Sequence, residues 1–245
     1  MNWDDYDAVL FDLDGVITPT AEVHMRAWAA MFNAFLDERR ATGGAPDEDL
    51  APYTEADYFA HVDGKPRYDG VRDFLDSRGI ALPEGSPLDG PEALTVCGLG
   101  NRKNDAFNVV LDREGVQAFP GSLALLDHLA DRRMPLAVVS SSVNAPAVLK
   151  AAGLLDRFEI VVDGALATEQ GLAGKPSPAT FAHAAAHVGA PAARAVVLED
   201  AVSGVRAGAS GGFGLVVGVD RGAGADVLLE AGAHLVVTDL AELVP

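Results

Sequence analysis

The sequence predicts a doubly wound α/β domain, built on a parallel sheet, with a helical domain inserted into it. Short apolar runs recur along the 245 residues and alternate with Ala-rich and Leu-rich stretches of helical spacing. This pattern is typical of a parallel sheet covered by helices on both faces. One long interval lacks such runs. We therefore expect a Rossmann-like core formed by residues 1–20 and 115–245, and a helical cap formed by residues 21–114.

Each predicted strand of the core is a short run of apolar residues. The first, Ala8–Phe11, ends directly before an acidic residue. Helical stretches separate the later runs, which favours parallel strands joined by crossover helices. The later strands are expected at residues 136–139, 160–162, 196–198 and 215–219, and the core helices at residues 122–132, 145–152, 178–188 and 202–209.

The interval that follows the first strand has amphipathic helical patterns interrupted by Gly and Pro. The stretch 79–92 is rich in both residues, which break regular structure, and is expected to be a surface loop. An insert made of helices is therefore predicted. Its helices are expected at residues 22–39, 54–62, 71–77 and 102–114.

Composition narrows the classes of function. The 36 acidic and 18 basic residues give a formal net charge of −18, and no basic stripe is present that could neutralise a nucleic-acid backbone. Cys97 is the single cysteine, which excludes an intrachain disulfide and a multi-cysteine metal cluster. No apolar run approaches the roughly 20 residues of a membrane span. We expect a cytoplasmic protein, a monomer or weak homodimer, that binds neither nucleic acid nor membrane.

Polar side chains gather where three of the predicted strands end. Asp12 and Asp14 follow the first strand, Ser140 follows the run at 136–139, and Glu199 and Asp200 follow the run at 196–198. In open α/β sheets, ligands bind at the carboxyl ends of the strands. Carboxylates that share this edge repel one another, and Mg²⁺ with its preference for oxygen ligands resolves the repulsion. We therefore expect Asp12, Asp14, Glu199 and Asp200 to hold Mg²⁺. Because Mg²⁺ usually takes only one or two carboxylates, Asp12 and Asp200 could suffice, with Glu199 in support.

Two further residues suit a phosphate. Lys175 precedes a predicted helix within a Gly-Lys-Pro sequence and supplies a point charge for a phosphate or for an ionised aspartate. The hydroxyl of Ser140 is placed to hold a phosphoryl oxygen. Taken singly, Lys175 is equally well explained as a surface charge, and Ser140 is better explained as a turn or N-cap residue. Their joint occurrence beside the aspartates favours a site that handles phosphate.

These segments resemble the motifs of the haloacid dehalogenase superfamily, in the same order and strand context and across nearly the whole chain. The resemblance implies an α/β core with a cap, and phosphoryl transfer as the reaction. The matching positions are Asp12-x-Asp14-Gly15 for the first motif, Ser140 for the second, Lys175 for the third and Glu199-Asp200 for the fourth.

The resemblance also implies catalytic roles. Asp12 would attack phosphorus and form an aspartyl phosphate, and Asp14 would protonate the leaving oxygen and then act as a general base. An aspartate at position 14 points to phosphoryl transfer and away from dehalogenation. A carboxylate is a competent nucleophile at phosphorus once Mg²⁺ and Lys175 offset the charge repulsion.

Within the superfamily, the chain is most similar to the β-phosphoglucomutase-like subfamily. The run from Asp12 to Trp28 follows that pattern almost continuously, as does the run Ser140–Asn144. The likeness implies a small phosphorylated sugar as the substrate. It places Thr20, His24 and Trp28 at the hinge between core and cap, although His24 and Trp28, four residues apart on one helical face, could simply pack there. It assigns substrate binding to Ser141, Ser142 and Asn144 as well.

The cap segment 98–105 resembles the loop by which these enzymes bind sugar and phosphate. Gly98, Arg102 and Lys103 would contact the substrate, with Arg102 as the phosphate anchor, because a planar guanidinium suits bidentate contact with phosphate. The segment departs from the usual pattern in its length and in Asn101 and Lys103. Its Gly-x-Gly is not a dinucleotide fingerprint, because the third Gly is missing and the segment lies in the insert.

Three functions remain open. The first is a mutase that interconverts β-D-glucose 1-phosphate and glucose 6-phosphate through an aspartyl phosphate and a bisphosphate intermediate. Cap closure, with Arg102 clamping a second phosphate, favours it. The second is a Mg²⁺-dependent phosphatase of a small sugar phosphate. The third, a sensor or scaffold without turnover, is disfavoured because Asp12, Asp14, Ser140, Lys175 and Asp200 are all retained.

Overall fold

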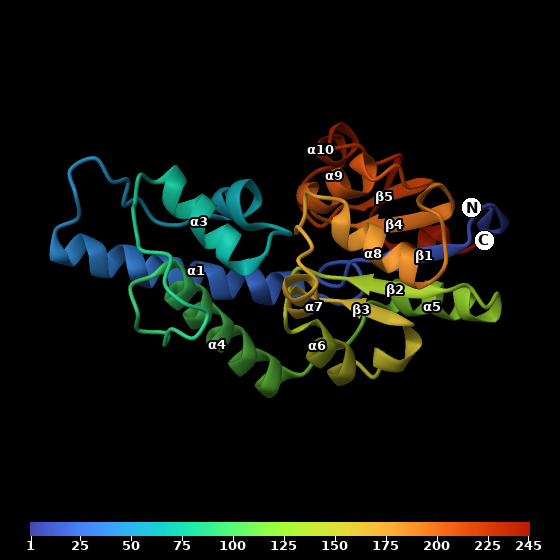
Figure 1. Ribbon diagram of the computed structural model, residues 1–245, viewed down its shortest axis with the longest axis horizontal. Helices are drawn as coiled ribbons and strands as arrows, with labels where there is room; N and C mark the ends of the chain where they lie inside the picture. Colours follow the sequence, from blue (N-terminus) through green and yellow to red (C-terminus); the bar gives the residue numbers. More distant parts are fainter. The chain divides into compact units, whose positions relative to one another are not determined.

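The structure is a computed structural model that describes residues 1–245, and it divides into two compact units (Figure 1). The core unit comprises Met1–Ala21, Gly64–Pro66 and Val116–Pro245. The cap unit comprises Glu22–Asp63 and Arg67–Gly115. Gly64–Pro66, which the sequence places inside the cap, thus groups with the core.

Close packing explains why this short segment belongs to the core. A Cβ atom at Gly64 would lie 2.3 Å from Oγ of Ser203 and 2.8 Å from Cβ of Ala201. A Cβ atom at Gly174 would likewise lie 2.4 Å from the ring of Pro66. The absence of a side chain at Gly64 and Gly174 therefore allows the segment to lie against the loops that carry the third and fourth motifs.

The core is built on a six-stranded parallel sheet with the order β3-β2-β1-β4-β5-β6. This is a doubly wound order, in which the winding reverses between β1 and β4 and leaves a ligand crevice at the carboxyl ends of these strands. The five predicted strands are confirmed, and β6 is an addition at the edge. The strands are β1 (Ala8–Phe11), β2 (Leu136–Val139), β3 (Ile160–Val162), β4 (Ala195–Glu199), β5 (Leu215–Val219) and β6 (Leu235–Val237).

Helices cover the sheet on both faces. Helices α8, α9 and α10 pack against strands on one face, and α5 and α6 lie on the other side of the sheet in Figure 1. The four predicted core helices are present within two residues of their expected bounds, whereas α7 and α10 were not predicted. The core helices are α5 (Pro120–Asp131), α6 (Ala145–Ala151), α7 (Gly164–Glu169), α8 (Ala179–His187), α9 (Val202–Ser210) and α10 (Ala225–Glu230).

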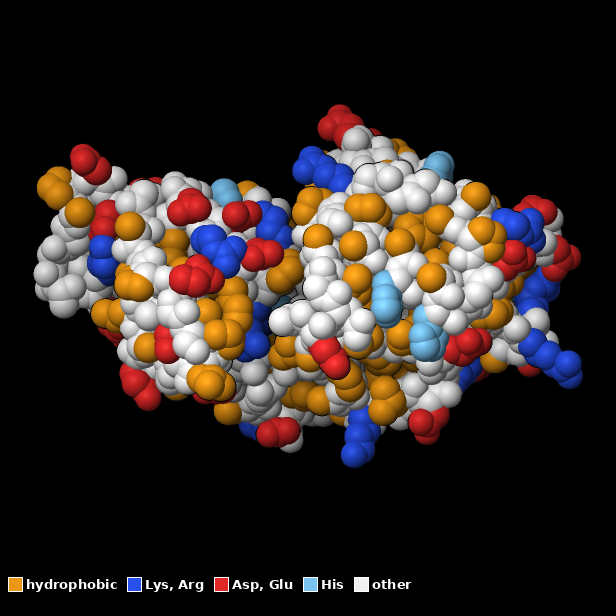
Figure 2. Space-filling view, viewed as in Figure 1, with side chains coloured by type: hydrophobic (Ala, Val, Ile, Leu, Met, Phe, Trp, Pro, Cys, Tyr) orange, Lys and Arg blue, Asp and Glu red, His pale blue; other side chains and the backbone are white.

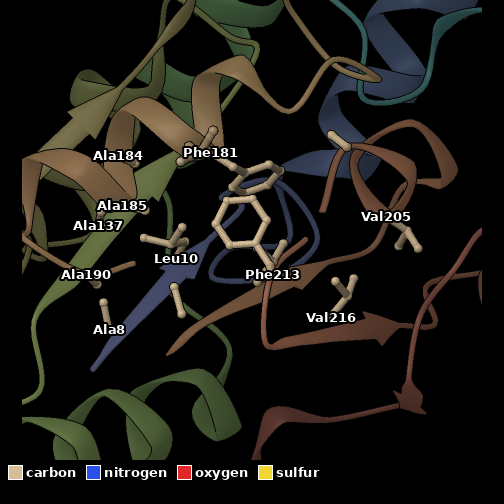
Figure 3. Close-up of a cluster of buried hydrophobic side chains, with 14 of the residues drawn as sticks. Ala8, Leu10, Ala137, Phe181, Ala184, Ala185, Ala190, Val205, Phe213 and Val216 are labelled. Carbon is tan, nitrogen blue, oxygen red and sulfur yellow. The ribbon is translucent and has the colours of Figure 1, made fainter. Parts of the chain in front are cut away.

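The interface between the sheet and helices α8 to α10 is apolar and built largely from small residues (Figure 3). Phe181 of α8 and Phe213 meet edge to face, with 6.0 Å between ring centroids, beside Leu10 of β1. Many of the remaining members are alanines or valines. The core helices therefore lie close to the strands.

The cap is helical, as predicted. Its apolar core is aromatic, with Trp28 stacked on Phe32 at 5.3 Å and Phe32 in contact with Tyr53 and Phe74. The stretch 79–92 contains no helix or strand, in agreement with the predicted loop. The helical elements are α1 (Thr20–Thr42), α2 (Glu55–Asp57), which continues into a π-helical turn (Tyr58–Val62), α3 (Arg67–Ser77) and α4 (Val96–Glu114).

Helix α4 begins six residues earlier than predicted, so the interpretation of residues 98–105 as a loop is wrong. The hydroxyl of Thr95 caps the helix by accepting a hydrogen bond from the N–H of Gly98 at 2.9 Å. A Cβ atom at Gly98 would lie 2.2 Å from the carbonyl oxygen of Ala93, and one at Gly100 would lie 2.8 Å from the ring of Tyr68. The two glycines therefore permit close packing of the first turns of a helix.

The surface agrees with the charge composition. On the face of each unit shown in Figure 2, Lys and Arg side chains lie among acidic ones and form no continuous basic strip. None of the helices combines the length and the apolar character that crossing a membrane requires.

Candidate active site

The first motif forms a tight turn directly after β1. The N–H groups of Ile17 and Thr18 both donate to the carbonyl of Leu13, at 2.9 and 3.1 Å. The N–H of Gly15 donates to the carbonyl of Thr18 at 2.7 Å. These bonds close the chain on itself and hold Asp14 inside a turn of fixed shape.

Gly15 brings the first motif against the fourth. Its φ is +85°, in the region that favours glycine. A Cβ atom at this position would lie 1.9 Å from Oδ2 of Asp200. The carboxyl group of Asp200 therefore occupies the space that any side chain at position 15 would need.

Asp12, Lys175 and Glu199 form a buried charged triad, in which Nζ of Lys175 lies 2.5 Å from Oδ1 of Asp12 and 2.5 Å from Oε1 of Glu199. The same ammonium group donates to the carbonyl of Val139 at 3.0 Å and lies 5.1 Å above the ring of Phe181. Three strands and the start of α8 thus position a single lysine. The third motif, which lies in the loop before α8, thus contacts the first and the fourth.

The triad buries one basic and two acidic groups, and both burial and the charges of the neighbouring groups shift the pKa values of Asp12 and Lys175. Burial raises the pKa of Asp12 well above its usual range, although the charge of Lys175 opposes the rise. Burial alone would lower the pKa of Lys175, but the charges of Asp12 and Glu199 outweigh it and the pKa is raised. Lys175 therefore stays an ammonium ion, and a cation beside Asp12 would favour its ionised form.

Glu199 is occupied within the protein. Its Oε1 bonds to Lys175, and its Oε2 accepts a hydrogen bond from the N–H of Ala201 at 2.8 Å. The side chain is fully buried and packs against Gly204, where a Cβ atom would lie 1.7 Å from Oε1. Both oxygens of Glu199 thus have partners within the protein, and metal binding by this residue stays a prediction.

Asp14 is held by a threonine pair. The hydroxyl of Thr20 donates to Oδ1 of Asp14, and the hydroxyl of Thr18 lies 2.7 Å from that of Thr20. Thr18 and Thr20 are both buried. Thr20, predicted as a hinge and substrate residue, therefore contacts the carboxyl group of Asp14 directly.

The second motif forms a turn that begins α6. Oγ of Ser140 accepts from the N–H of Ser142 at 3.1 Å, and Oγ of Ser142 accepts from the N–H of Asn144 at 3.2 Å. Ser140 is buried beside the strand ends. Oγ of Ser141 donates to the carbonyl of Gly64 at 2.8 Å. Ser140 and Ser142 thus use their lone pairs in the turn and keep a hydroxyl proton to donate, whereas the proton of Ser141 is used.

The oxygen donors of the site suit a magnesium ion that takes some of its ligands from the protein and the others from substrate and water. The predicted ligands Asp12 and Asp200 follow the neighbouring strands β1 and β4, and metal binding by the predicted set of four side chains stays a prediction. Mg²⁺ usually takes one or two carboxylates and fills its remaining positions with water and substrate oxygens. Asp12 and Asp200, both buried at the carboxyl ends of β1 and β4, fit that requirement. Metal binding by Asp14 stays a prediction.

In the cap, His24, Trp28 and Lys103 lie together. Nζ of Lys103 bonds to Nδ1 of His24 and lies 4.9 Å from the ring centroid of Trp28. His24 stacks on Phe107 at 4.1 Å, and Lys103 is 4% exposed. Packing thus accounts for Trp28, which belongs to the apolar core of the cap, and substrate contact by His24 and Lys103 stays a prediction.

Arg102 is engaged with other parts of the cap. Its Nε donates to the carbonyl of Pro91 at 2.7 Å, and its Nη1 lies 3.6 Å from Glu38. A phosphate bound here would compete with the Pro91 and Glu38 contacts. Gly98 lies inside α4, where it serves helix packing. Substrate contact by Arg102 and Gly98 stays a prediction.

Three residues near the first motif were not predicted. Thr18 was read as part of the motif run without a role, and Ser122 and Arg221 were not singled out. Oγ of Ser122 donates to the carbonyl of Val16, and Nε of Arg221 donates to the carbonyl of Gly15, each at 2.7 Å. Arg221 follows the carboxyl end of β5, so the rule that found Asp12 and Asp200 could have found it.

The sheet order, the inserted cap and the buried Asp–Lys–Glu triad define a class of phosphate-handling α/β enzymes. Residues 6–212 match the family model of haloacid dehalogenase-like hydrolases. The chain belongs to the haloacid dehalogenase superfamily and, within it, to the β-phosphoglucomutase-like subfamily.

Three comparisons describe its relatives. The chain is 50% identical over 241 residues to the β-phosphoglucomutase of Mycobacterium bovis, covering 96% of this chain and 90% of the relative. It is 31% identical to hexitol phosphatase A of Escherichia coli, over 83% of this chain and 78% of the relative. The crystal structure of β-phosphoglucomutase from Clostridium difficile matches with a TM-score of 0.75 and 24% identity, covering 97% of this chain and 93% of that chain. This last likeness concerns the fold alone.

Proposed function

We propose that the chain is a Mg²⁺-dependent phosphotransferase that interconverts β-D-glucose 1-phosphate and glucose 6-phosphate through an aspartyl phosphate and a bisphosphate intermediate. The observation that carries the proposal is the identity of 50% to a β-phosphoglucomutase over 96% of the chain. The buried contact between Asp12 and Lys175 supports the reaction class, because it places an ammonium ion beside the carboxylate that would attack.

In the first step, a carboxylate oxygen of Asp12 forms a bond to phosphorus, and the bond from phosphorus to the leaving oxygen breaks. Lys175 holds the attacking carboxylate through Oδ1 and is itself oriented by Glu199 and the carbonyl of Val139. Ser140 keeps a proton that can bind a phosphoryl oxygen. Magnesium bound by Asp12 and Asp200 would supply the charge that offsets repulsion between carboxylate and phosphate.

Asp14 moves the proton. It gives a proton to the leaving oxygen as the aspartyl phosphate forms, and takes one from the accepting hydroxyl when the phosphoryl group leaves Asp12. The hydroxyl of Thr20 donates to Oδ1 of Asp14 and so helps to fix the carboxyl group that would exchange the proton. One carboxyl group thus serves both directions of an isomerisation.

Mutase and phosphatase differ in what accepts the phosphoryl group from Asp12. A mutase offers a sugar hydroxyl and excludes water, whereas a phosphatase admits water. The likeness to hexitol phosphatase A keeps hydrolysis of a small sugar phosphate as the second candidate. Both share the chemistry at Asp12 and Asp14.

The deciding experiment incubates purified protein with Mg²⁺, β-D-glucose 1-phosphate and a glucose bisphosphate activator. We expect glucose 6-phosphate to form without a matching release of inorganic phosphate. Prompt phosphate release without glucose 6-phosphate would replace the mutase by the phosphatase. Asp12→Asn is the control, because it removes the nucleophile and is expected to lower kcat by at least about 10³-fold. Turnover by this variant at the wild-type rate would refute the role of Asp12.

A further inference from the structure

Arg221, which follows β5, lies against the turn that carries Asp14. Its Nε donates to the carbonyl of Gly15 at 2.7 Å, and its Nη1 donates to the carbonyl of Thr238 at 2.9 Å. The guanidinium group also lies 4.1 Å from the ring centroid of Phe119. Two carbonyl groups and an aromatic face therefore fix the plane of the guanidinium, which a lysine could not reproduce.

The next two carbonyl groups of the turn are held as well. The buried hydroxyl of Ser122 donates to the carbonyl of Val16 at 2.7 Å, and the N–H of Phe119 donates to the carbonyl of Ile17 at 2.9 Å. Three consecutive peptide groups, beginning at Gly15, thus bond to donors at least 100 residues away in sequence. Groups distant in sequence therefore hold the turn in addition to its own local hydrogen bonds.

Gly15 is the position where this anchoring matters most. Glycine has the greatest backbone freedom of any residue. Gly15 also adjoins two carboxyl groups to which the proposed function assigns roles, those of Asp14 and Asp200. Its peptide nitrogen is bonded to the carbonyl carbon of Asp14, and its Cα lies against the carboxyl group of Asp200. A shift of the Gly15 peptide would displace both carboxylates, and a displacement of about 1 Å can cost about 100-fold in rate.

We propose that Arg221 is a positioning residue, which sets the place of Asp14 and Asp200 through the Gly15 carbonyl. The inference rests on the proposed phosphoryl transfer and adds a residue outside the four motifs. Arg221 acts through the turn and not through the substrate. Its loss should therefore lower kcat while leaving KM almost unchanged.

The test compares four variants with the wild type in the sugar phosphate assay. Arg221→Met removes both hydrogen bonds, and we expect kcat to fall about 10–100-fold, the usual loss when a supporting group is removed. Arg221→Lys keeps the charge and a donor, so its kcat should lie between those of the wild type and of Arg221→Met. Ser122→Ala releases a single carbonyl and should lower kcat by about 3–10-fold. Arg157→Met is the matched control, because Arg157 is paired with Asp127 at 2.8 Å on the surface.

Two further readouts separate positioning from general stability. Thermal unfolding shows whether each variant is folded at the assay temperature. Hydrogen exchange of residues 13–18 should increase in Arg221→Met and stay at the wild-type level in Arg157→Met. A folded Arg221→Met with wild-type kcat would overturn the proposal, as would a loss of activity that follows only the unfolded fraction.

If Arg221→Met does not fold, Arg221→Lys and Ser122→Ala decide the question. A lower kcat with constant KM in both supports positioning, and wild-type kcat in both overturns it. A wild-type protein that turns over no phosphorylated sugar would instead refute the proposed function, and with it the inference. An active wild type with an unaffected Arg221→Met refutes the inference alone.

Discussion

Lys175 and Glu199 form an ion pair in the interior of the core, with 2.5 Å between Nζ and Oε1 and side chains that are 1% and 0% exposed. Lys175 also contacts Asp12, so the pair links the end of β4 to the carboxyl group that follows β1.

Replacing Glu199 by Gln keeps the size of the side chain and removes its charge. Its oxygens bond to Lys175 and to the N–H of Ala201, both of which are donors. The amide NH₂ of Gln would face one of them, so a buried donor loses its partner. We expect the free energy of unfolding to fall by about 1–3 kcal/mol and kcat to fall by about 10–100-fold, measured by urea unfolding and by the sugar phosphate assay.

The control for this change is Asp127→Asn. Asp127 pairs with Arg157 on the surface, where an ion pair contributes at most about 1 kcal/mol. We expect no loss of kcat in the control. Equal effects of the two substitutions would contradict the orienting role of Glu199.

Thr20→Val tests the contact with Asp14. Valine has the shape of threonine but cannot donate to Oδ1 of Asp14. A hydrogen bond to a charged group contributes about 1.5–3 kcal/mol, so we expect kcat to fall by about 10-fold or more. Thr20→Ser retains the hydroxyl and should restore most of the rate. A Thr20→Val variant as active as Thr20→Ser would show that the hydroxyl has no part in the reaction.

Gly15→Ala tests the contact between the first and fourth motifs. A methyl group at position 15 would lie 1.9 Å from Oδ2 of Asp200, so the carboxyl group must move. We expect kcat to fall by at least about 100-fold and the Mg²⁺ concentration for half-maximal activity to rise. Gly153→Ala is the matched control, because Gly153 also has a positive φ, +70°, but nothing lies within 4 Å of the added methyl. Similar activity losses in both would mean that backbone strain alone is responsible.

The cap should lose stability in acid through Asp57. Partial burial alone would raise the pKa of Asp57, but hydrogen bonds from Thr54 and Arg78 outweigh it and hold the pKa below its usual value of 3.8. Because the folded state has the lower pKa, the stabilisation is complete above the unfolded value and is lost as the pH falls below it. The free energy of unfolding should therefore decrease between about pH 5 and pH 3.

Substitution identifies the group responsible. Asp57→Asn cannot titrate, so the decrease in unfolding free energy over this pH range should be smaller than in the wild type. Asp76→Asn replaces an exposed carboxylate of α3 and should leave the decrease unchanged. A wild-type pH dependence in Asp57→Asn would assign the acid sensitivity to other groups.

Much of the fold could be predicted because the strands are buried on both faces and read as uninterrupted apolar runs. The strand Leu235–Val237 was not predicted, because the apolar pattern of a three-residue edge strand is too short to recognise. The start of α4 was misplaced because Gly98 and Gly100 each disfavour a helix by about 1 kcal/mol. Tertiary packing overrides that preference, since both glycines allow close contacts that other residues would prevent.

The residues at the strand ends could be predicted from the sequence. The partner that each side chain contacts could be predicted less well, because it depends on the direction of that side chain. Asp12 and Glu199 lie at the ends of the neighbouring strands β1 and β4, and both contact Lys175. Glu199 and Asp200 are neighbours in sequence and were both assigned to Mg²⁺, with Glu199 in support, but β4 ends at Glu199 and the two side chains have different partners. Glu199 therefore turns to Lys175 while Asp200 lies against Gly15. The partners of Arg102 come from a loop and another helix, and no local pattern reveals them.

The alanines between the sheet and helices α8 to α10 have a consequence for how this sequence can change over evolutionary time. Eight of the buried members of that interface are alanines. A methyl group added at Gly208 of α9 would lie only 3.0 Å from the side chain of Val216. Enlarging such a residue costs about 1–3 kcal/mol through overpacking. Drift at this interface is therefore confined to residues of similar volume, and a saturation mutagenesis experiment would find its alanines less replaceable than the exposed leucines of the cap.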